Sequence, residues 1–165
     1  MKPVAVVIAA ICIVVSAGPL RGDVPVPRFT RTVTAGYPVV VDAATGLVWQ
    51  GCPAGMTGDA ASCSGTASTM SWQAALDYCQ DSTLAGFSDW YLPSINELRS
   101  IVDNHQASPS IDRTFFPGTP SGMFWSSSSS AGSASNGWCV GFNLGNVSIN
   151  DKTSTNYVRC VRLGP

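Results

Sequence analysis

The sequence predicts an α+β domain with two helices, a small antiparallel sheet and a long loop region. Residues 71–79 and 94–103 carry apolar side chains at the three- and four-residue spacing of amphipathic helices. Residues 138–163 instead alternate apolar and polar side chains, which is typical of strands joined by tight turns. Residues 104–136 hold no convincing long element, and such a stretch in a compact domain is usually functional or mobile.

Length and composition limit the classes of protein to consider. A chain of 165 residues is long enough for one domain and short for two. Charged side chains make up 12% and the formal net charge is −1, which argues against nucleic acid as a partner, because its binders carry a basic face. Five Trp, four Tyr and six Phe argue against a disordered chain.

The N-terminus has the pattern of a secretory signal peptide. Lys2 precedes an uninterrupted apolar run, Val4–Val15, which is shorter than the roughly 20 residues that span a bilayer. Small residues up to Ala17 suit cleavage there, and an uncleaved anchor is the alternative. Cleavage would leave an exported protein without a membrane span, extracellular, at the cell surface or periplasmic. The predicted organisation is a signal peptide, an extended leader and a folded domain: residues 1–17, 18–38 and 39–163.

The elements of the domain follow in order. Two short strands, Pro38–Val41 and Leu47–Gln50, are expected around a turn, followed by a small polar loop over residues 51–70. Both helices begin at a capping serine, and Glu97 completes a capping box at the second. Ser71 caps the first helix, and its apolar face consists of Trp72, Ala75, Leu76 and Cys79. Ser94 caps the second helix, and its apolar face consists of Ile95, Leu98, Ile101 and Val102. Strands are then expected at residues 138–142, 146–150 and 157–163.

Export makes disulfides the natural use of the five cysteines that remain after cleavage. Cys52 and Cys63 bracket a surface excursion and are expected to form a local bridge. Cys79 lies on the buried helix face and is expected to pair with Cys160 in the last strand, a Cys139–Cys160 bridge being the alternative. Cys139 is then a free thiol. We expect it to point outward, because Trp138, Val140 and Phe142 are expected to face the core. The alternative is an inverted alternation, with Cys139 buried and inert.

The side chains of common catalytic and metal sites are scarce. A single His and the absence of a Gly-x-Ser-x-Gly motif leave no candidate catalytic residue. There is no Cys-x-x-Cys pair for zinc. Asn150, Asp151 and Asn156 leave calcium open as a cofactor, although no EF-hand spacing supports it. We expect no enzyme, no catalytic residue and no resident metal or other cofactor.

Five blocks of sequence, in this order, resemble one bacterial family. They are Thr45–Gln50, Ser71–Cys79, Leu84–Pro93, Phe124–Ser127 and Tyr157–Arg162. Together they resemble the C-terminal domain of the Legionella collagen-like adhesin over residues 39–163. That resemblance implies a C-type-lectin-like fold with two helices, a small sheet and a long loop region before the last strands.

The resemblance also implies a ligand and an oligomeric state, but the composition of this chain differs from what they require. In the adhesin the domain is associated with sulfated glycosaminoglycans and with trimers below a collagen-like stalk. This chain has no collagen tract, and removal of Lys2 with the signal peptide leaves eight basic against ten acidic side chains, a balance of −2 that opposes polyanion binding. Tyr91 stands where the family usually has Arg, and Cys139 where an aromatic residue is common. An enzyme is a third reading, because a related lectin-like fold serves the formylglycine-generating oxidases.

The function that we expect is non-catalytic recognition of a surface ligand. Residues 104–136 and the adjacent strands would bind a surface glycan or a protein ligand, with aromatic faces stacking on sugar rings. The alternative is a structural or protein-interaction domain, a homo-oligomer that dimerises through Cys139. The candidate ligand-binding residues are Trp125, Ser126, Ser127, Ser128, Asn136 and Arg159.

Overall fold

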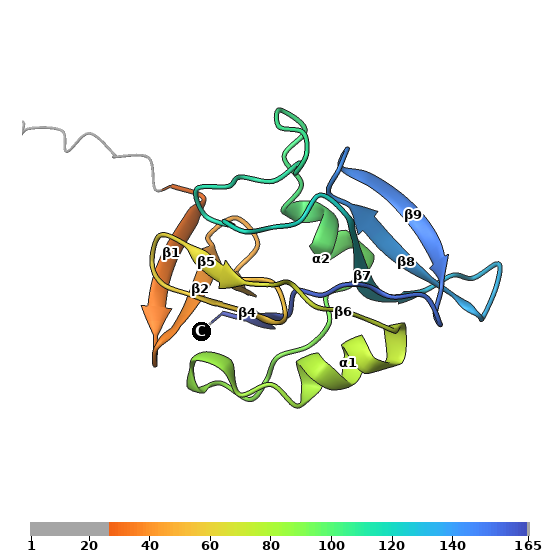
Figure 1. Ribbon diagram of the computed structural model, residues 1–165, viewed down its shortest axis with the longest axis horizontal. Coiled ribbons are helices and arrows are strands. Elements are labelled where there is room, and N and C mark those ends of the chain that lie inside the picture. The colour runs from red at the N-terminus through yellow and green to blue at the C-terminus, as the bar shows by residue number, and fades with distance from the viewer. Residues whose placement is uncertain (1–26, 165) are drawn as a thin grey trace, which may run out of the picture.

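The computed structural model describes residues 27–164, and strands dominate it (Figure 1). Strands account for 36% of the structure and helices for 13%, and the strands form three sheets. The prediction of an α+β domain with two helices and one small sheet is therefore wrong. Several strands are only two or three residues long, which is too short to produce a recognisable alternation in the sequence. The predicted signal peptide lies outside the described residues.

The first sheet has four strands in the order β1-β2-β3-β11, and each neighbouring pair is antiparallel. Strands β2 (Tyr37–Asp42) and β3 (Leu47–Gln50) are at the predicted positions, and β11 (Val161–Leu163) completes the sheet. Strand β1 (Phe29–Thr34) pairs along its whole length with β2, within residues that we expected to be an extended leader. Phe29 is buried in the core, so the described fold begins before residue 39.

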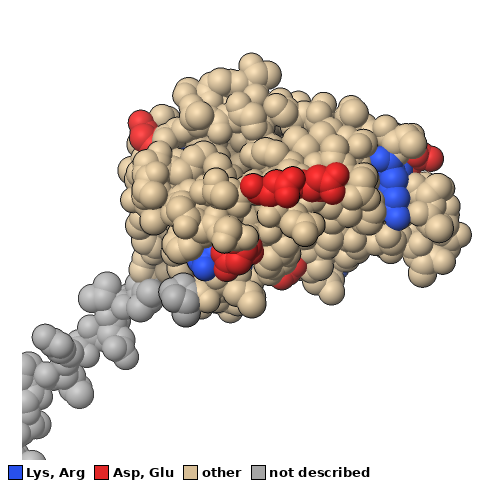
Figure 2. Space-filling model, turned by 90° about the horizontal axis from the view of Figure 1, so that it is seen from below, with Lys and Arg blue, Asp and Glu red and all other residues tan. Residues whose placement is uncertain are grey.

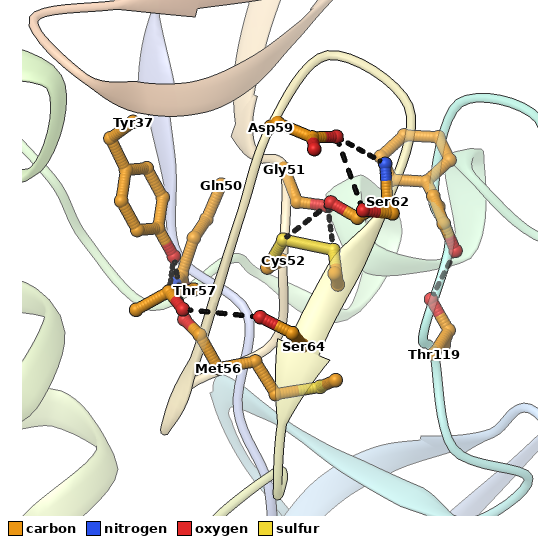
Figure 3. Close-up of a disulfide and its surroundings, with 12 residues drawn as sticks. Tyr37, Gln50, Gly51, Cys52, Met56, Thr57, Asp59, Ser62, Ser64 and Thr119 are labelled. Atoms are coloured by element: carbon orange, nitrogen blue, oxygen red, sulfur yellow. Dashed lines mark hydrogen bonds between the residues drawn. A yellow bond between two sulfur atoms is a disulfide. The ribbon is translucent and has the colours of Figure 1, made fainter.

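The excursion after β3 is a small hairpin held by a disulfide (Figure 3). Strands β4 (Met56–Gly58) and β5 (Cys63–Gly65) pair where the sequence predicted a loop, and the Cys52–Cys63 bridge is confirmed. Backbone N–H groups of Ala61 and Ser62 donate to the Asp59 carboxylate at 2.8 and 2.7 Å and close the tip of the hairpin.

Both predicted α-helices are present. In α1 (Trp72–Gln80) the Ser71 side chain accepts a hydrogen bond from the Ala74 N–H, and in α2 (Ile95–Ser100) Ser94 and Glu97 make the complete capping box. A 3-10 turn, η1 (Leu84–Gly86), lies between the two helices. Each α-helix buries only a few apolar side chains, so the helices cover the sheets rather than form the core.

The second sheet has five strands in the order β6-β10-β7-β8-β9. Its strands are β6 (Thr69–Met70), β7 (Met123–Ser129), β8 (Asn136–Gly141), β9 (Asn146–Asp151) and β10 (Asn156–Tyr157). Strand β7 lies inside the segment 104–136, which was expected to hold no long element. Residues 104–122 contain neither helix nor strand, so the expected loop region is confined to them.

Both faces of β8 are covered where Cys139 lies, and this determines the environment of Cys139. Val140 and Phe142 join one cluster of buried side chains, while Cys139 joins another with Trp125 and Cys79. Cys139 is the free cysteine of the described chain and is 0% exposed, so the prediction that it points outward is wrong. Strand alternation indicates an exposed side only where one face of a sheet meets solvent.

The Cys79–Cys160 disulfide is confirmed, with the two Cα atoms 5.5 Å apart. It joins α1 to the last part of the chain across a sequence separation of 81, whereas Cys52 and Cys63 are separated by 11. We predict that Cys79→Ala/Cys160→Ala lowers the free energy of unfolding by about 4.5 kcal/mol and Cys52→Ala/Cys63→Ala by at most about 3 kcal/mol, because the longer ring restricts the unfolded chain more. Urea denaturation of the two double variants measures both losses, and the opposite order would contradict this assignment.

Burial also predicts the reactivity of Cys139. Burial raises the pKa of its thiol to about 11, so the native protein holds little thiolate at pH 8. In the chain without residues 1–17, we expect Cys139 to react with a thiol reagent only after unfolding, and then as one thiol per chain. Labelling of the native protein as fast as that of free cysteine would show that the thiol is accessible.

Candidate functional site

Arg159, a predicted ligand-binding residue, lies in the interior of the molecule. Its side chain is 0% exposed, and its guanidinium donates to the Gln50 carbonyl at 2.9 Å and to the Thr119 hydroxyl at 2.8 Å. The guanidinium also lies 4.9 Å from the centre of the Phe116 ring. Burial lowers the pKa of Arg159 to about 9. A side chain so enclosed holds the fold together and cannot contact a surface ligand.

Trp125 and Ser126 are also buried, and their polar atoms are used inside the protein. The Trp125 indole N–H donates to the Met70 carbonyl at 2.9 Å, which connects β7 to β6. The Ser126 hydroxyl donates to the Trp138 carbonyl at 2.7 Å, which connects β7 to β8. Both side chains therefore have structural roles in the sheet interior, for which aromatic and hydroxyl groups are also suited.

Ser127 and Ser128 lie at an irregularity where the pairing of β7 with β8 shifts between Trp125 and Ser129. The Ser127 N–H donates to the Pro93 carbonyl at 2.8 Å. The Ser128 hydroxyl accepts from the Ile95 N–H at 3.0 Å. These two bonds attach β7 to the first turn of α2, so both serines position a helix.

An open groove of about 480 Å³ lies between α2 and the β8–β9 hairpin. The side chains or backbone of five residues line it: Ile95, Arg99, Trp138, Gly145 and Val147. Trp138 lies directly opposite Ile149, and Val140 opposite Val147, so these four side chains share one face of the hairpin. Val140 is buried and packs with the core, whereas Trp138, two residues earlier in β8, stays partly exposed. The sequence had indicated that Trp138 belongs to the core.

Arg99 gives the groove a cationic side chain without a partner. Arg28 pairs with Asp42 at 2.9 Å and Arg162 with Asp89 at 2.7 Å, but the exposed Arg99 makes no ion pair or side-chain hydrogen bond within residues 27–164. Its five N–H donors are therefore available to a ligand. Sequence analysis missed Arg99, because nothing in the helix pattern distinguishes an unpaired arginine from a paired one.

Asn136, the sixth predicted ligand-binding residue, lies outside the lining of this groove. It lies two residues before Trp138 on the same face of β8, opposite Asp151 of β9. Its side chain is partly exposed. Of the six predicted residues, three are buried, two position α2 and Asn136 is partly exposed on β8.

A second hollow, of about 340 Å³, lies between α1 and residues 90–92. Tyr91, which replaces the usual arginine of the resembled family, contributes to its wall and donates its hydroxyl hydrogen to Glu97 at 2.9 Å. Burial, together with the adjacent Glu97 carboxylate, raises the pKa of Tyr91 to about 12. The tyrosine thus supports the start of α2 and leaves this hollow without a free cation.

The fold and the groove define a small, disulfide-stabilised, β-rich domain. The chain belongs to the Lcl C-terminal domain family, whose model matches residues 38–162. The adhesin-like family suggested by the five sequence blocks is thereby confirmed. None of the curated proteins matches the chain.

Two further findings bear on location and chemistry. The two disulfides fit an extracellular protein, since such bonds persist in oxidising surroundings. Neither helix of residues 27–164 has both the length and the apolar composition to cross a membrane. Within the same residues, no three His, Cys, Asp or Glu side chains gather as metal ligands.

The structural role of Arg159 can be tested against an exposed arginine. Arg159→Ala removes the donors to Gln50 and Thr119 and leaves buried acceptors unpaired, so we expect a loss of about 3 kcal/mol in the free energy of unfolding. Arg113→Ala, at an exposed arginine without an ion pair in the described chain, should change it by less than about 0.5 kcal/mol. Equal effects in chemical denaturation would contradict this role.

Proposed function

We propose that the protein is an exported, non-catalytic recognition module that binds a carbohydrate in the groove between α2 and the β8–β9 hairpin. The observation that carries the proposal is the partly exposed Trp138 beside the unpaired Arg99. An indole ring stacks on the C–H face of a sugar, while a guanidinium donates hydrogen bonds to its hydroxyl or acidic oxygens. The volume of about 480 Å³ lies in the usual range for small-molecule sites.

The charge distribution favours a short or weakly charged glycan over a long polyanion. Residues 27–164 hold seven basic and nine acidic side chains, and Arg99 is the basic residue of the groove lining. Figure 2 shows one face of the molecule, on which most atoms belong to uncharged residues and acidic side chains form a short row. A polyanion would require a broader cationic surface.

The residues of the groove support binding without catalysis. Its lining consists of two aliphatic side chains, one Trp, one Arg and one Gly, none of which is an ordinary general base or nucleophile at neutral pH. Binding through stacking and hydrogen bonds needs no metal ion. We therefore propose that glycan binding is independent of calcium.

The second candidate is a structural or protein-interaction domain. Leu144 and Ile149, which are 72% and 43% exposed, lie on the same hairpin as Trp138 and favour contact with another protein surface. The buried Cys139 provides no route to a covalent dimer. The two candidates differ in the ligand, so a glycan screen separates them.

The test is a glycan array with the chain lacking residues 1–17, with and without EDTA, followed by calorimetry on the best ligand. We expect Arg99→Ala and Trp138→Ala each to weaken binding by at least about tenfold, because each removes a principal contact, and EDTA to have no effect. Arg113→Ala is the matched control and should bind as the parent does.

Circular dichroism and thermal unfolding of the variants separate lost binding from lost folding. Because Trp138 also contributes apolar packing, Arg99→Ala is the decisive variant. No glycan bound by the parent, or equal weakening by Arg99→Ala and Arg113→Ala, would contradict the proposed groove.

A further inference from the structure

Strand β9 is a free edge of the second sheet. It is the last strand in the order β6-β10-β7-β8-β9, and it forms one side of the molecule in Figure 1. Beyond its ladder with β8, no backbone hydrogen bond joins residues 146–150 to the rest of residues 27–164. Natural edge strands are usually protected by Lys, Pro or a bulge. Strand β9 contains neither Lys nor Pro, and its pairing with β8 is regular from end to end.

The other edges of the two sheets are less suited to pairing. Strand β6 has two residues, and β11 has three and is bridged on its far side by the backbone of Tyr91. Strand β1 is long enough, but Arg31 lies near its middle and its side chain bonds to the carbonyls of Gly51 and Phe115. Strand β9 thus combines sufficient length with an unprotected edge.

The sequence of β9 is chemically symmetric about Ser148. Asn146-Val147-Ser148-Ile149-Asn150 reads as amide, β-branched apolar, hydroxyl, β-branched apolar, amide in both directions. If two such strands pair antiparallel with Ser148 opposite its own copy, Val147 lies opposite Ile149 and Asn146 opposite Asn150. Opposed side chains are then alike in chemistry at all five positions. The one charged residue, Asp151, lies opposite Gly145, so no like charges oppose each other.

We propose that β9 pairs with β9 of a second copy of this chain, about a two-fold axis through Ser148, and joins the two five-stranded sheets into one. Such an isologous interface satisfies both free edges with the same surface patch. The cross-strand Val147–Ile149 pairs extend the apolar face that already holds Trp138. Because the axis is perpendicular to the sheet, both grooves lie on the same face of the dimer.

The spacing of the grooves follows from strand geometry. The two β8 strands are three strand separations apart, so the two Trp138 residues lie about 15 Å apart across the sheet. Where the proposed glycan function holds, a repeating glycan could occupy both grooves, and the paired copies would bind it more tightly than one copy does. The dimer itself does not depend on that function.

Site-directed crosslinking tests the register. A Cys at position 148 would lie opposite its own copy, with Cα atoms about 5 Å apart, which a disulfide can span. A Cys at position 146 would lie about 14 Å from its own copy, beyond that reach. Both variants need a Cys139→Ala background, because Cys139 lies opposite Ser148 within one chain. Under mild oxidation we expect Ser148→Cys to give a covalent dimer and Asn146→Cys to stay monomeric.

Sedimentation velocity tests the interface without crosslinking. We expect the parent chain without residues 1–17 to sediment as a dimer at about 100 μM and to dissociate on dilution. Ile149→Lys puts a charge into the pairing and should give a monomer at every concentration, while Val33→Lys, at a similarly exposed apolar residue of β1 in the other sheet, should leave the dimer intact. Circular dichroism checks that both variants fold.

Three results would overturn the proposal. One is a parent protein that stays monomeric at about 100 μM. Another is a dimer that persists in Ile149→Lys, since the contact would then lie elsewhere. The last is equal crosslinking at positions 146 and 148. Glycan binding by a monomeric Ile149→Lys variant would still support the groove, so the two proposals fail separately.

Discussion

A buried polar junction between the end of β3 and the C-terminal segment determines how the two large sheets sit together. The Gln50 side chain accepts from the Cys160 N–H at 3.0 Å and donates to the hydroxyls of Tyr37 and Tyr78 at 3.1 and 3.2 Å. Arg159 donates to the Gln50 carbonyl, and Cys160 is bonded to Cys79. The C-terminal segment contributes β10 to one sheet and β11 to the other, so this junction lies where the chain passes between them. Loss of any one partner would leave buried polar groups without hydrogen bonds, at a cost in free energy.

The same arrangement explains why the second sheet carries polar residues inside. With clusters of buried side chains on both faces at this point, Ser126 of β7 has no solvent to reach and must find partners in the protein. Ser126 bonds to the β8 backbone and Ser128 to the start of α2, and both bonds position elements beside the groove. The groove lies between the β8–β9 hairpin and α2, and Trp138 is partly uncovered in it.

Features that depend on neighbouring residues could be predicted from the sequence, and features that depend on distant packing could not. The caps at Ser71 and Ser94 act over three residues, so both helix starts were found. The Cys79–Cys160 pairing was found because helix periodicity placed Cys79 inward. The burial of Cys139 was missed because it requires knowing that both faces of β8 are covered. Strand β7 was missed because a serine-rich sequence has no apolar alternation, and Arg99 because its lack of a partner is a property of the tertiary structure.

The five sequence blocks of the family contain buried structural residues, whereas the groove residues lie outside them. Gln50, Cys79, Trp125 and Arg159 all lie in those blocks, and all are buried structural residues. The groove residues Arg99, Trp138 and Val147 lie outside every block, on the hairpin and on the exposed side of α2. Substitution there would leave the disulfide and the Gln50 junction untouched. The blocks therefore hold the framework around the Cys79–Cys160 disulfide, while the proposed binding groove is formed by side chains outside them. Strand β9, on which the proposed pairing between copies depends, also lies outside the blocks.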